Sequence, residues 1–165
     1  MAFSIRNSKL EDLRDIDALY ARSYPKLLKE DYSPSVLVTI VPMFSKAQPK
    51  LVTSDSFYVA TEEGEILGAG GWTKTGPRGE VIPRTGHIRH FATDPSALRR
   101  GIAKALMERC LSGATRVGVD TLCCYSTLTA VPFYQAMGFE VKGDLIIEFA
   151  SALEFPAVWM ENKLV

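Results

Sequence analysis

The sequence predicts an α/β fold of the α+β type, in which a mixed β-sheet carries helices on both faces. Short strands and amphipathic helices follow one another in the order β-α-α-β-β-β-α-β-α-β-β. Residues 87–125 form a strand–helix–strand unit, whose strands we expect to be parallel and joined by a right-handed crossover. Because 47% of the 165 residues are hydrophobic, the chain can build one core, and we expect a single domain over residues 1–165.

The amino-terminal half is expected to contain three strands and two helices. Apolar residues at helical spacing predict the first helix, and Ser33 followed by Pro34 is a typical N-cap and first-turn pair for the second. Gly64 supplies the positive φ that turns the second and third strands into a hairpin. The expected elements are a strand at 3–6, helices at 11–23 and 34–43, a loop at 46–56, and strands at 57–61 and 66–74.

The carboxy-terminal half is expected to contain four strands and two helices. Asp94-Pro95 ends the first of these strands, and Gly118 is suited to the C′ position after a long amphipathic helix. A nearly continuous apolar run at 119–125 is typical of a strand in the middle of a sheet. The expected elements are a loop at 75–85, strands at 87–93 and 119–125, helices at 101–116 and 130–137, and an antiparallel pair at 139–149 and 157–164.

Charge and cysteine content narrow the function classes. The 19 Lys and Arg residues balance 19 Asp and Glu residues, so neither nucleic acid nor an anionic membrane is expected as the main partner. The three cysteines are an odd number without framework spacing, which predicts free thiols in a reducing compartment. The first residues lack the pattern of a signal peptide, so we expect a soluble, cytoplasmic protein. The sequence leaves the oligomeric state open, with a homodimer as one alternative.

No metal site is predicted. His87 and His90 lie three residues apart in an expected strand, so strand alternation sends them to opposite faces. The adjacent Cys123 and Cys124 diverge in the same way and are expected to be buried, inert thiols. The glycine-rich stretch 68–76 lacks the Lys-Ser/Thr pair of a P-loop and is not followed by a helix. Its glycines are expected to relieve crowding in a strand.

An anion-binding turn is predicted where the strand at 87–93 leads into the helix at 101–116. Gly101 and Ala103 keep large side chains off this turn, so backbone N–H groups and the positive end of the helix dipole can face an anion. Arg99, Arg100 and Lys104 add positive charge that is suited to a polyphosphate. The alternative is an ordinary helix start with solvated basic residues.

A second segment, Ala130-Val-Pro-Phe-Tyr-Gln-Ala-Met-Gly-Phe139, favours the anion-binding turn over this alternative. Together the two segments resemble the GCN5-related N-acetyltransferase (GNAT) superfamily over residues 87–139. The resemblance rests on a Q/R-x-x-G-x-G/A loop followed, at the right distance, by an A-x-x-(F/L)-Y-x-x-x-G-F helix. It implies a GNAT-like fold with a central, mostly antiparallel sheet that contains one parallel strand pair.

The resemblance also implies acetyl-CoA as the co-substrate, and no metal. In this family the strand, loop and helix bind the pyrophosphate, and the tyrosine of the second motif, here Tyr134, protonates the CoA thiolate. The cofactor-binding positions carried over are Phe91, Ala92, Thr93, Leu98, Arg99, Arg100, Gly101, Ile102, Ala103, Lys104 and Thr127.

The chain departs from the family pattern at three places. Leu98 stands where the family usually has Gln or Arg, and Thr127 stands where many members have a cofactor-contacting Asn. No glutamate occurs in the strands where members often place a general base. His87 falls at a strand position where some members carry a Glu or His base, and its imidazole can accept a proton near neutral pH. The alternative is a hydrogen-bonded strand histidine. His90 is a weaker candidate, because its side chain is expected to face away from those of His87, Arg89 and Phe91.

We therefore expect an acyltransferase that moves an acetyl group from acetyl-CoA to a primary amine of a small molecule or peptide, by direct attack in a ternary complex. A route through a cysteine is disfavoured because Cys123 and Cys124 lack a base partner in the sequence. A catalytically silent acyl-CoA-binding or sensing module stays open, as does transfer to a hydroxyl or of a longer acyl chain. The acceptor site is expected to be shaped by residues 24–44, 72–85 and 153–156.

Overall fold

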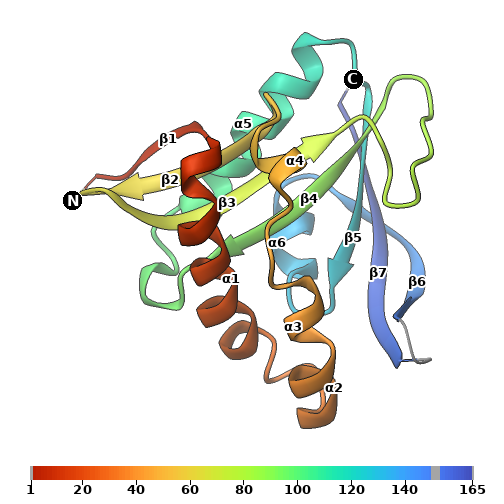
Figure 1. Ribbon diagram of the computed structural model, residues 1–165. Coiled ribbons are helices and arrows are strands. Elements are labelled where there is room, and N and C mark those ends of the chain that lie inside the picture. The colour runs from red at the N-terminus through yellow and green to blue at the C-terminus, as the bar shows by residue number, and fades with distance from the viewer. Residues whose placement is uncertain (1, 150–152, 165) are drawn as a thin grey trace.

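The computed structural model describes residues 2–149 and 153–164, and its strands form one seven-stranded sheet in the order β1-β2-β3-β4-β5-β7-β6 (Figure 1). Every neighbouring pair is antiparallel except β4 and β5, which are parallel, as predicted. The strands are β1 (Ser4–Asn7), β2 (Phe57–Glu62), β3 (Glu65–Thr73), β4 (Thr85–Thr93), β5 (Thr121–Thr127), β6 (Glu140–Phe149) and β7 (Leu153–Lys163).

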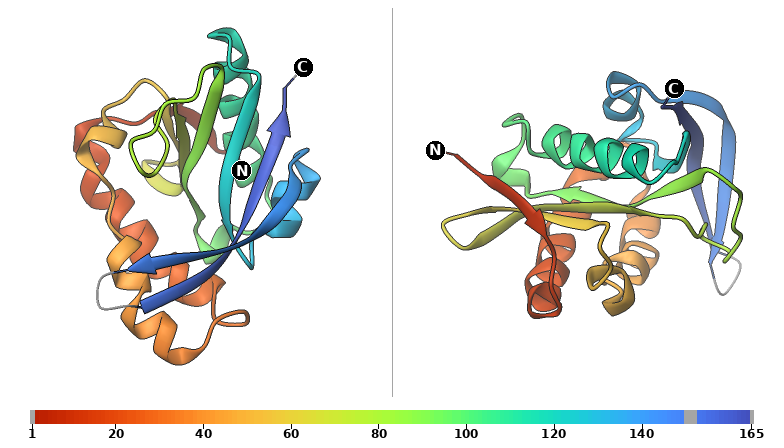
Figure 2. Two further views of the ribbon diagram at one scale, coloured as in Figure 1. Left: turned by 90° about the vertical axis from the view of Figure 1, so that its right-hand side faces the viewer. Right: turned by 90° about the horizontal axis from the view of Figure 1, so that it is seen from above.

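Helices cover both faces of the sheet, which confirms the predicted fold class. Figure 2 shows α1, α2 and α3 on one face and α5 on the other. A buried core lies under each layer: one is built around Ile16, Leu19 and Tyr20 of α1, the other around Leu106 and Met107 of α5. The helices are α1 (Leu13–Leu27), α2 (Pro34–Thr39), α3 (Val41–Phe44), α4 (Pro49–Val52), α5 (Ile102–Arg116) and α6 (Val131–Ala136).

The first layer of helices differs from the prediction at three places. α1 continues past residue 23 and through Pro25, because burying Tyr24 and Leu28 in the core favours the longer helix. The helix expected at 34–43 is divided into α2 and α3 at Ile40, since Pro42 has no N–H to continue the helical hydrogen bonds. The loop expected at 46–56 contains α4, which buries Leu51 against the core.

The glycine-rich part of β3 does relieve crowding, as predicted. A β-carbon on Gly68 would lie 2.6 Å from Cγ2 of Ile102, and one on Gly70 would lie 2.5 Å from the ring of Phe91. These glycines let α5 and the Phe91 side chain lie directly on the sheet.

The two parallel strands stay together only at their start. β4 and β5 are paired at Thr85–Thr121, Gly86–Leu122 and His87–Cys123, and no further pair follows. Figure 1 shows them running side by side and then separating, with α6 beside the opening. On the other side of β5, the strand β7 inserts between β5 and β6 and pairs with both. β7 begins at Leu153, four residues earlier than expected.

A bulge interrupts β4 beside the opening. Between the pairs Ala69–Ala92 and Gly71–Arg89, β3 has one residue and β4 has two. His90 is the extra residue, and its φ is 53°. A bulge leaves one residue out of the ladder and reverses the alternation of side chains beyond it.

No helix in the described part of the chain is long and apolar enough to cross a membrane. The described residues also contain no cluster of three His, Cys, Asp or Glu side chains that could hold a metal ion. The expected single domain stays a prediction, and its end residues 1 and 165 lie outside the described part.

Candidate active site

A cavity of about 550 Å³ lies where β4 and β5 separate. Its walls come from β4, β5, α1, α6 and the β6–β7 hairpin, so it joins segments that are far apart in the sequence. At one end it reaches Thr93, Leu98 and Ala103, and at the other it reaches Pro77 and His87. All three segments expected to shape the acceptor site contribute, through Tyr24, Leu27, Leu28, Pro77 and Phe155 among others.

The turn into α5 has the geometry of an anion site. Gly101 is the N-cap of α5 with φ 84°, and nothing lies within 4 Å of the position where its β-carbon would be. The N–H groups of the first helical turn have no acceptor within the helix. An anion placed outside Gly101 would face these N–H groups and the positive end of the helix dipole.

The side chains around this turn are used in different ways. Ile102 is buried in the second core, so it offers only its backbone N–H to a ligand. Arg100 turns to Glu62 of β2, with Nη2 2.6 Å from Oε2. Arg99 and Lys104 are exposed, and half-exposed Leu98 lines the cavity. The structure thus brings the predicted positions of the turn together but directs Arg100 partly to the protein itself.

Two tyrosines of α1 hold the bulge of β4. The Tyr20 hydroxyl donates to the carbonyl of His90 at 2.8 Å, and the Tyr24 hydroxyl donates to the carbonyl of Phe91 at 3.0 Å. Both tyrosines are buried, and burial raises the pKa of each, so both remain protonated donors. The sequence analysis missed them, because they lie 70 and 67 residues before their partners on β4 and have the spacing of core residues.

The bulge also corrects the expected placement of side chains along β4. The ring of His90 lies 4.8 Å from that of Tyr20, whereas Phe91 packs on Phe133 and Tyr134 on the other face. Strict alternation would put Phe91 on the face of His87 and Arg89, and His90 on the opposite face. Both predictions were wrong, because Phe91 packs with Ile88 in the core under α5, and His90 lies with Tyr20 on the face of His87 and Arg89. The extra residue at His90 shifts the alternation by one position.

Tyr134 of α6 reaches the cavity from the face of α5. Its ring makes edge contacts with Phe133 and Phe139, with centroid separations of 5.3 and 5.4 Å. Burial raises the pKa of Tyr134 well above its usual value, and the neighbouring Cys124 thiol raises it further. The phenol therefore keeps its proton across the neutral range and can donate it.

His87 lies on the opposite side of the cavity from the turn into α5. Its side chain is 6% exposed, and Nε2 has no hydrogen-bond partner among the described residues. Burial lowers the pKa of His87 most strongly; the charge of Glu80 raises it and that of Arg89 lowers it. The imidazole is therefore mainly neutral at pH 7, and it lines the cavity with its Nε2 buried. The sequence analysis did not identify Glu80, which lies in the loop at 75–85.

The two cysteines of β5 are poor nucleophiles. Burial raises the pKa of Cys123 to about 11 and that of Cys124 to about 12. Glu161 of β7 lies beside Cys123, with 3.9 Å between Sγ and Oε2, and its charge opposes a thiolate further. Both cysteines are buried and free, as predicted.

Thr127 and the loop after β5 close the cavity beside α6. The Thr127 hydroxyl accepts a hydrogen bond from the N–H of Ala130 at 3.2 Å. The Tyr32 hydroxyl bridges this loop to β7, because it accepts from the N–H of Leu128 and donates to the carbonyl of Pro156. Thr127 thus orders the start of α6 while facing the cavity.

Comparison with known proteins agrees with this arrangement. A family model described as an acetyltransferase (GNAT) domain matches residues 29–151. YafP of Escherichia coli K12, named as an uncharacterized N-acetyltransferase, is 23% identical over 149 residues, which cover 90% of this chain and 88% of the relative.

Two solved structures illustrate the likeness of the fold. PaiA N-acetyltransferase from Thermoplasma acidophilum, in complex with coenzyme A, has a TM-score of 0.75 at 16% identity, with 99% of both chains covered. A GCN5-related N-acetyltransferase from Rhodopseudomonas palustris has a TM-score of 0.80 at 18% identity, with 99% of this chain and 98% of that chain covered. The family model covers most of the sequence, and the chain belongs to the GNAT acetyltransferase family.

Proposed function

We propose that the protein transfers an acetyl group from acetyl-CoA to a primary amine of a small molecule or peptide, by direct attack in a ternary complex. The observation that carries the proposal is one cavity that holds both a proton acceptor and a proton donor. His87 lines it with a buried, neutral imidazole, and Tyr134 lines it with a phenol that keeps its proton.

The residues of the chain fit acetyl-CoA as the co-substrate. The turn at Gly101 offers free N–H groups at a helix start, which suits a pyrophosphate. Thr93, Leu98 and Ala103 continue from that turn into the cavity, so an elongated group could lie along β4. When bound, acetyl-CoA supplies an acetyl thioester. Backbone N–H groups of residues 91–93 are the donors nearest to the bulge that could hold its carbonyl oxygen.

Each of the two site residues has a distinct role. His87 accepts a proton from the incoming ammonium group, directly or through water, and leaves a neutral amine as the nucleophile. Tyr134 donates its proton to the sulfur as the carbon–sulfur bond breaks. The bulge residues, held by Tyr20 and Tyr24, keep the backbone between these groups in one conformation.

Other assignments explain the site less well. A route through an acyl-cysteine needs a thiolate, and burial raises the pKa of Cys123 and Cys124 far above neutrality. A silent acyl-CoA-binding module would have no use for a phenol and a neutral imidazole in the same cavity. Transfer to a hydroxyl or of a longer acyl chain would use the same groups, and these remain second candidates.

Thiol release tests the proposal. The purified protein is incubated with acetyl-CoA, with and without a panel of primary amines and matched alcohols, and free CoA is measured with a thiol reagent. Release that depends on an amine, together with acetylated amine seen by mass spectrometry, supports the proposal. CoA binding without release for any acceptor would favour the silent module, and release with alcohols alone would favour a hydroxyl acceptor.

A further inference from the structure

The ionisable side chains of Arg and His type that line the cavity are not balanced by acidic ones. Among the described residues that line it, His87, Arg89 and His90 are basic and none is Asp or Glu. The rest of the lining is mostly apolar, with Leu27, Leu51, Ile147, Phe149 and Phe155 on the walls formed by α1, α4 and the β6–β7 hairpin. A cavity built only to hold a cationic amine would be expected to contain a carboxylate.

Arg89 is the basic residue of this lining whose side chain stays positively charged at neutral pH. It lies on β4 just before the bulge and is partly buried. Its Nε donates to the Thr73 hydroxyl at 3.0 Å, which orients the guanidinium. In the described part of the chain, no carboxylate lies within 4.0 Å of it. The two terminal nitrogens of the guanidinium therefore keep their donors for a ligand, and they form the fork that matches a carboxylate.

Glu80 is the acidic residue whose charge acts on Arg89, and it does not neutralise the site. The Glu80 carboxylate accepts a hydrogen bond from the backbone N–H of Arg78 at 2.9 Å, and it does not line the cavity. Glu161 lies beside Cys123 and is also outside the lining. Among the described residues that line the cavity, Arg89 therefore has no carboxylate beside it that would compete with a ligand.

The position of Arg89 separates it from the acetyl-CoA side of the site. The turn at Gly101 and residues 91–93 lie at the carboxyl end of β4, beyond the bulge, whereas His87 and Arg89 lie before it. Arg89 shares a strand face with His87, the proposed base. A group bound by Arg89 would therefore belong to the molecule that His87 deprotonates.

We infer that the acceptor is a small amine that also carries a carboxylate on an apolar skeleton, with Arg89 binding the carboxylate. This inference rests on the proposed function. Arg89 is then the residue that determines specificity, the apolar walls hold the skeleton, and the amine is directed toward His87. An amine whose carboxylate is replaced by a carboxamide would leave the guanidinium unpaired in the cavity, which costs binding.

Binding and turnover are measured with matched pairs of probes. In the binding experiment, N-acetyl-leucine and N-acetyl-leucinamide are titrated by calorimetry into protein saturated with CoA. In the turnover experiment, leucine and 6-aminohexanoate are compared with their carboxamides by thiol release. The amide of leucine has the less basic amine and supplies more neutral nucleophile at a given pH. A preference for the acid therefore cannot come from amine reactivity.

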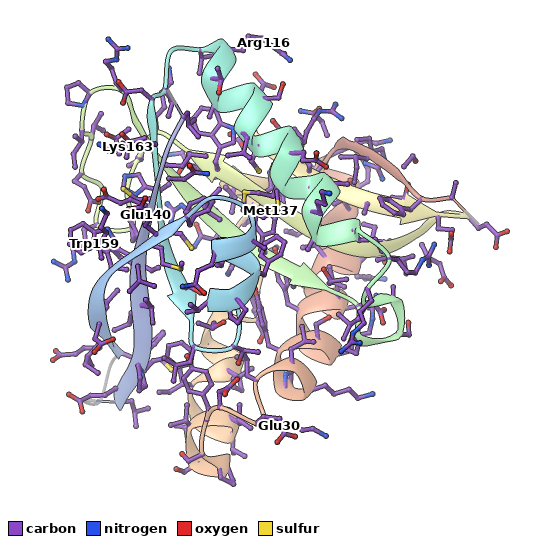
Figure 3. The ribbon with its side chains drawn as sticks, turned by 180° about the vertical axis from the view of Figure 1, so that it is seen from behind. Glu30, Arg116, Met137, Glu140, Trp159 and Lys163 are labelled. Atoms are coloured by element: carbon purple, nitrogen blue, oxygen red, sulfur yellow. The ribbon has the colours of Figure 1, made fainter. Side chains whose placement is uncertain are left out.

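The variants are Arg89→Gln, which removes the charge, and Arg89→Lys, which keeps the charge without the fork. Arg116→Gln, at the far end of α5 (Figure 3), is the matched control for loss of one arginine. We expect the wild type to prefer each acid over its amide by about 10- to 150-fold, the range for hydrogen bonds to a charged group. Arg89→Gln should abolish this preference, Arg89→Lys should keep part of it, and Arg116→Gln should keep all of it.

The outcomes separate the two proposals. Thiol release with amines but no preference for acids, or the same preference in Arg89→Gln, would overturn the inference and leave the proposed function standing. The absence of measurable binding of every acid would also overturn the inference. Arg89-dependent binding of the acids without thiol release from any amine would support the inference and count against the proposed acetyl transfer.

Discussion

Replacing Tyr134 by phenylalanine isolates the hydroxyl that we propose as the acid. The ring contacts with Phe133 and Phe139 need only the ring, so Phe keeps them. Removing the hydroxyl takes away only a polar group beside the Cys124 thiol, so the free energy of unfolding should change by no more than about 1 kcal/mol. General-acid assistance is worth about 10²–10⁴-fold, and CoA thiolate leaves readily, so we expect the low end. A 100-fold slower chemical step corresponds to about 2.7 kcal/mol.

Single-turnover kinetics measure this step directly. Enzyme in excess is mixed with acetyl-CoA and amine, and the rate of thiol release is compared with acetyl-CoA affinity from calorimetry. The affinity should change little, because the proton is needed in the transition state and hardly at all in the bound ground state. Tyr58→Phe is the matched control, since Tyr58 is buried at 5% exposure and does not line the cavity. A chemical step at the wild-type rate in Tyr134→Phe would refute the assignment and make Tyr134 a packing residue.

The other predictions concern the turn at Gly101, the ionisation of His87 and the packing of Gly68 in β3. Gly101→Glu should weaken CoA binding at least tenfold, about 1.4 kcal/mol, by placing a carboxylate in the anion site, whereas Gly79→Glu, at a similar φ in an open loop, should not. His87→Gln should remove the acid limb of kcat/KM, which we expect below pH 6.5 because burial lowers the pKa of His87. The same shift means that the unfolded chain binds a proton that the folded imidazole does not. Wild-type stability should therefore fall as the pH drops below about 6.5, more than that of His87→Gln. Gly68→Ala should lower the free energy of unfolding by about 1–3 kcal/mol, since its β-carbon would lie 2.6 Å from a methyl group of α5, whereas Gly143→Ala meets nothing within 4 Å.

Each of these predictions has a contrary result. Unchanged CoA affinity by calorimetry in folded Gly101→Glu would remove the pyrophosphate from this turn. An acid limb that survives in His87→Gln would assign the base to water or to the substrate's own ionisation. Equal denaturant midpoints for Gly68→Ala and wild type would show that α5 can move away from the sheet at little cost.

The sequence contained enough to predict the sheet and most of its elements. Apolar periodicity predicted the seven strands, and the strand–helix–strand unit predicted the parallel pair of β4 and β5. The elements that contain the two family motifs lie where they were expected, because helix caps and glycines mark their ends locally. Gly101, Gly118 and Gly138 all have positive φ at such ends.

The parts that could not be predicted depend on contacts between distant residues. The one-residue bulge at His90, with φ 53°, has no decisive local signal, because histidine is enriched at positive φ but still occurs there rarely. The bonds from Tyr20 and Tyr24 to β4 join residues 70 and 67 positions apart. Arg100 was expected to face the cofactor, and its pairing with Glu62, 38 residues away, appears only once β2 and α5 are side by side.

The place of β7 in the sheet has a consequence for how the protein is made. During synthesis β5 emerges well before β7, and at about 5–20 residues per second this interval lasts a few seconds. Until β7 is synthesised, the edge of β5 that later pairs with β7 has no partner strand. β6 has no partner strand either, because it joins the sheet only through β7. Unpaired edges invite association with other chains. A pause in translation between β5 and β7 should therefore promote aggregation, whereas the same pause after β7 should be harmless.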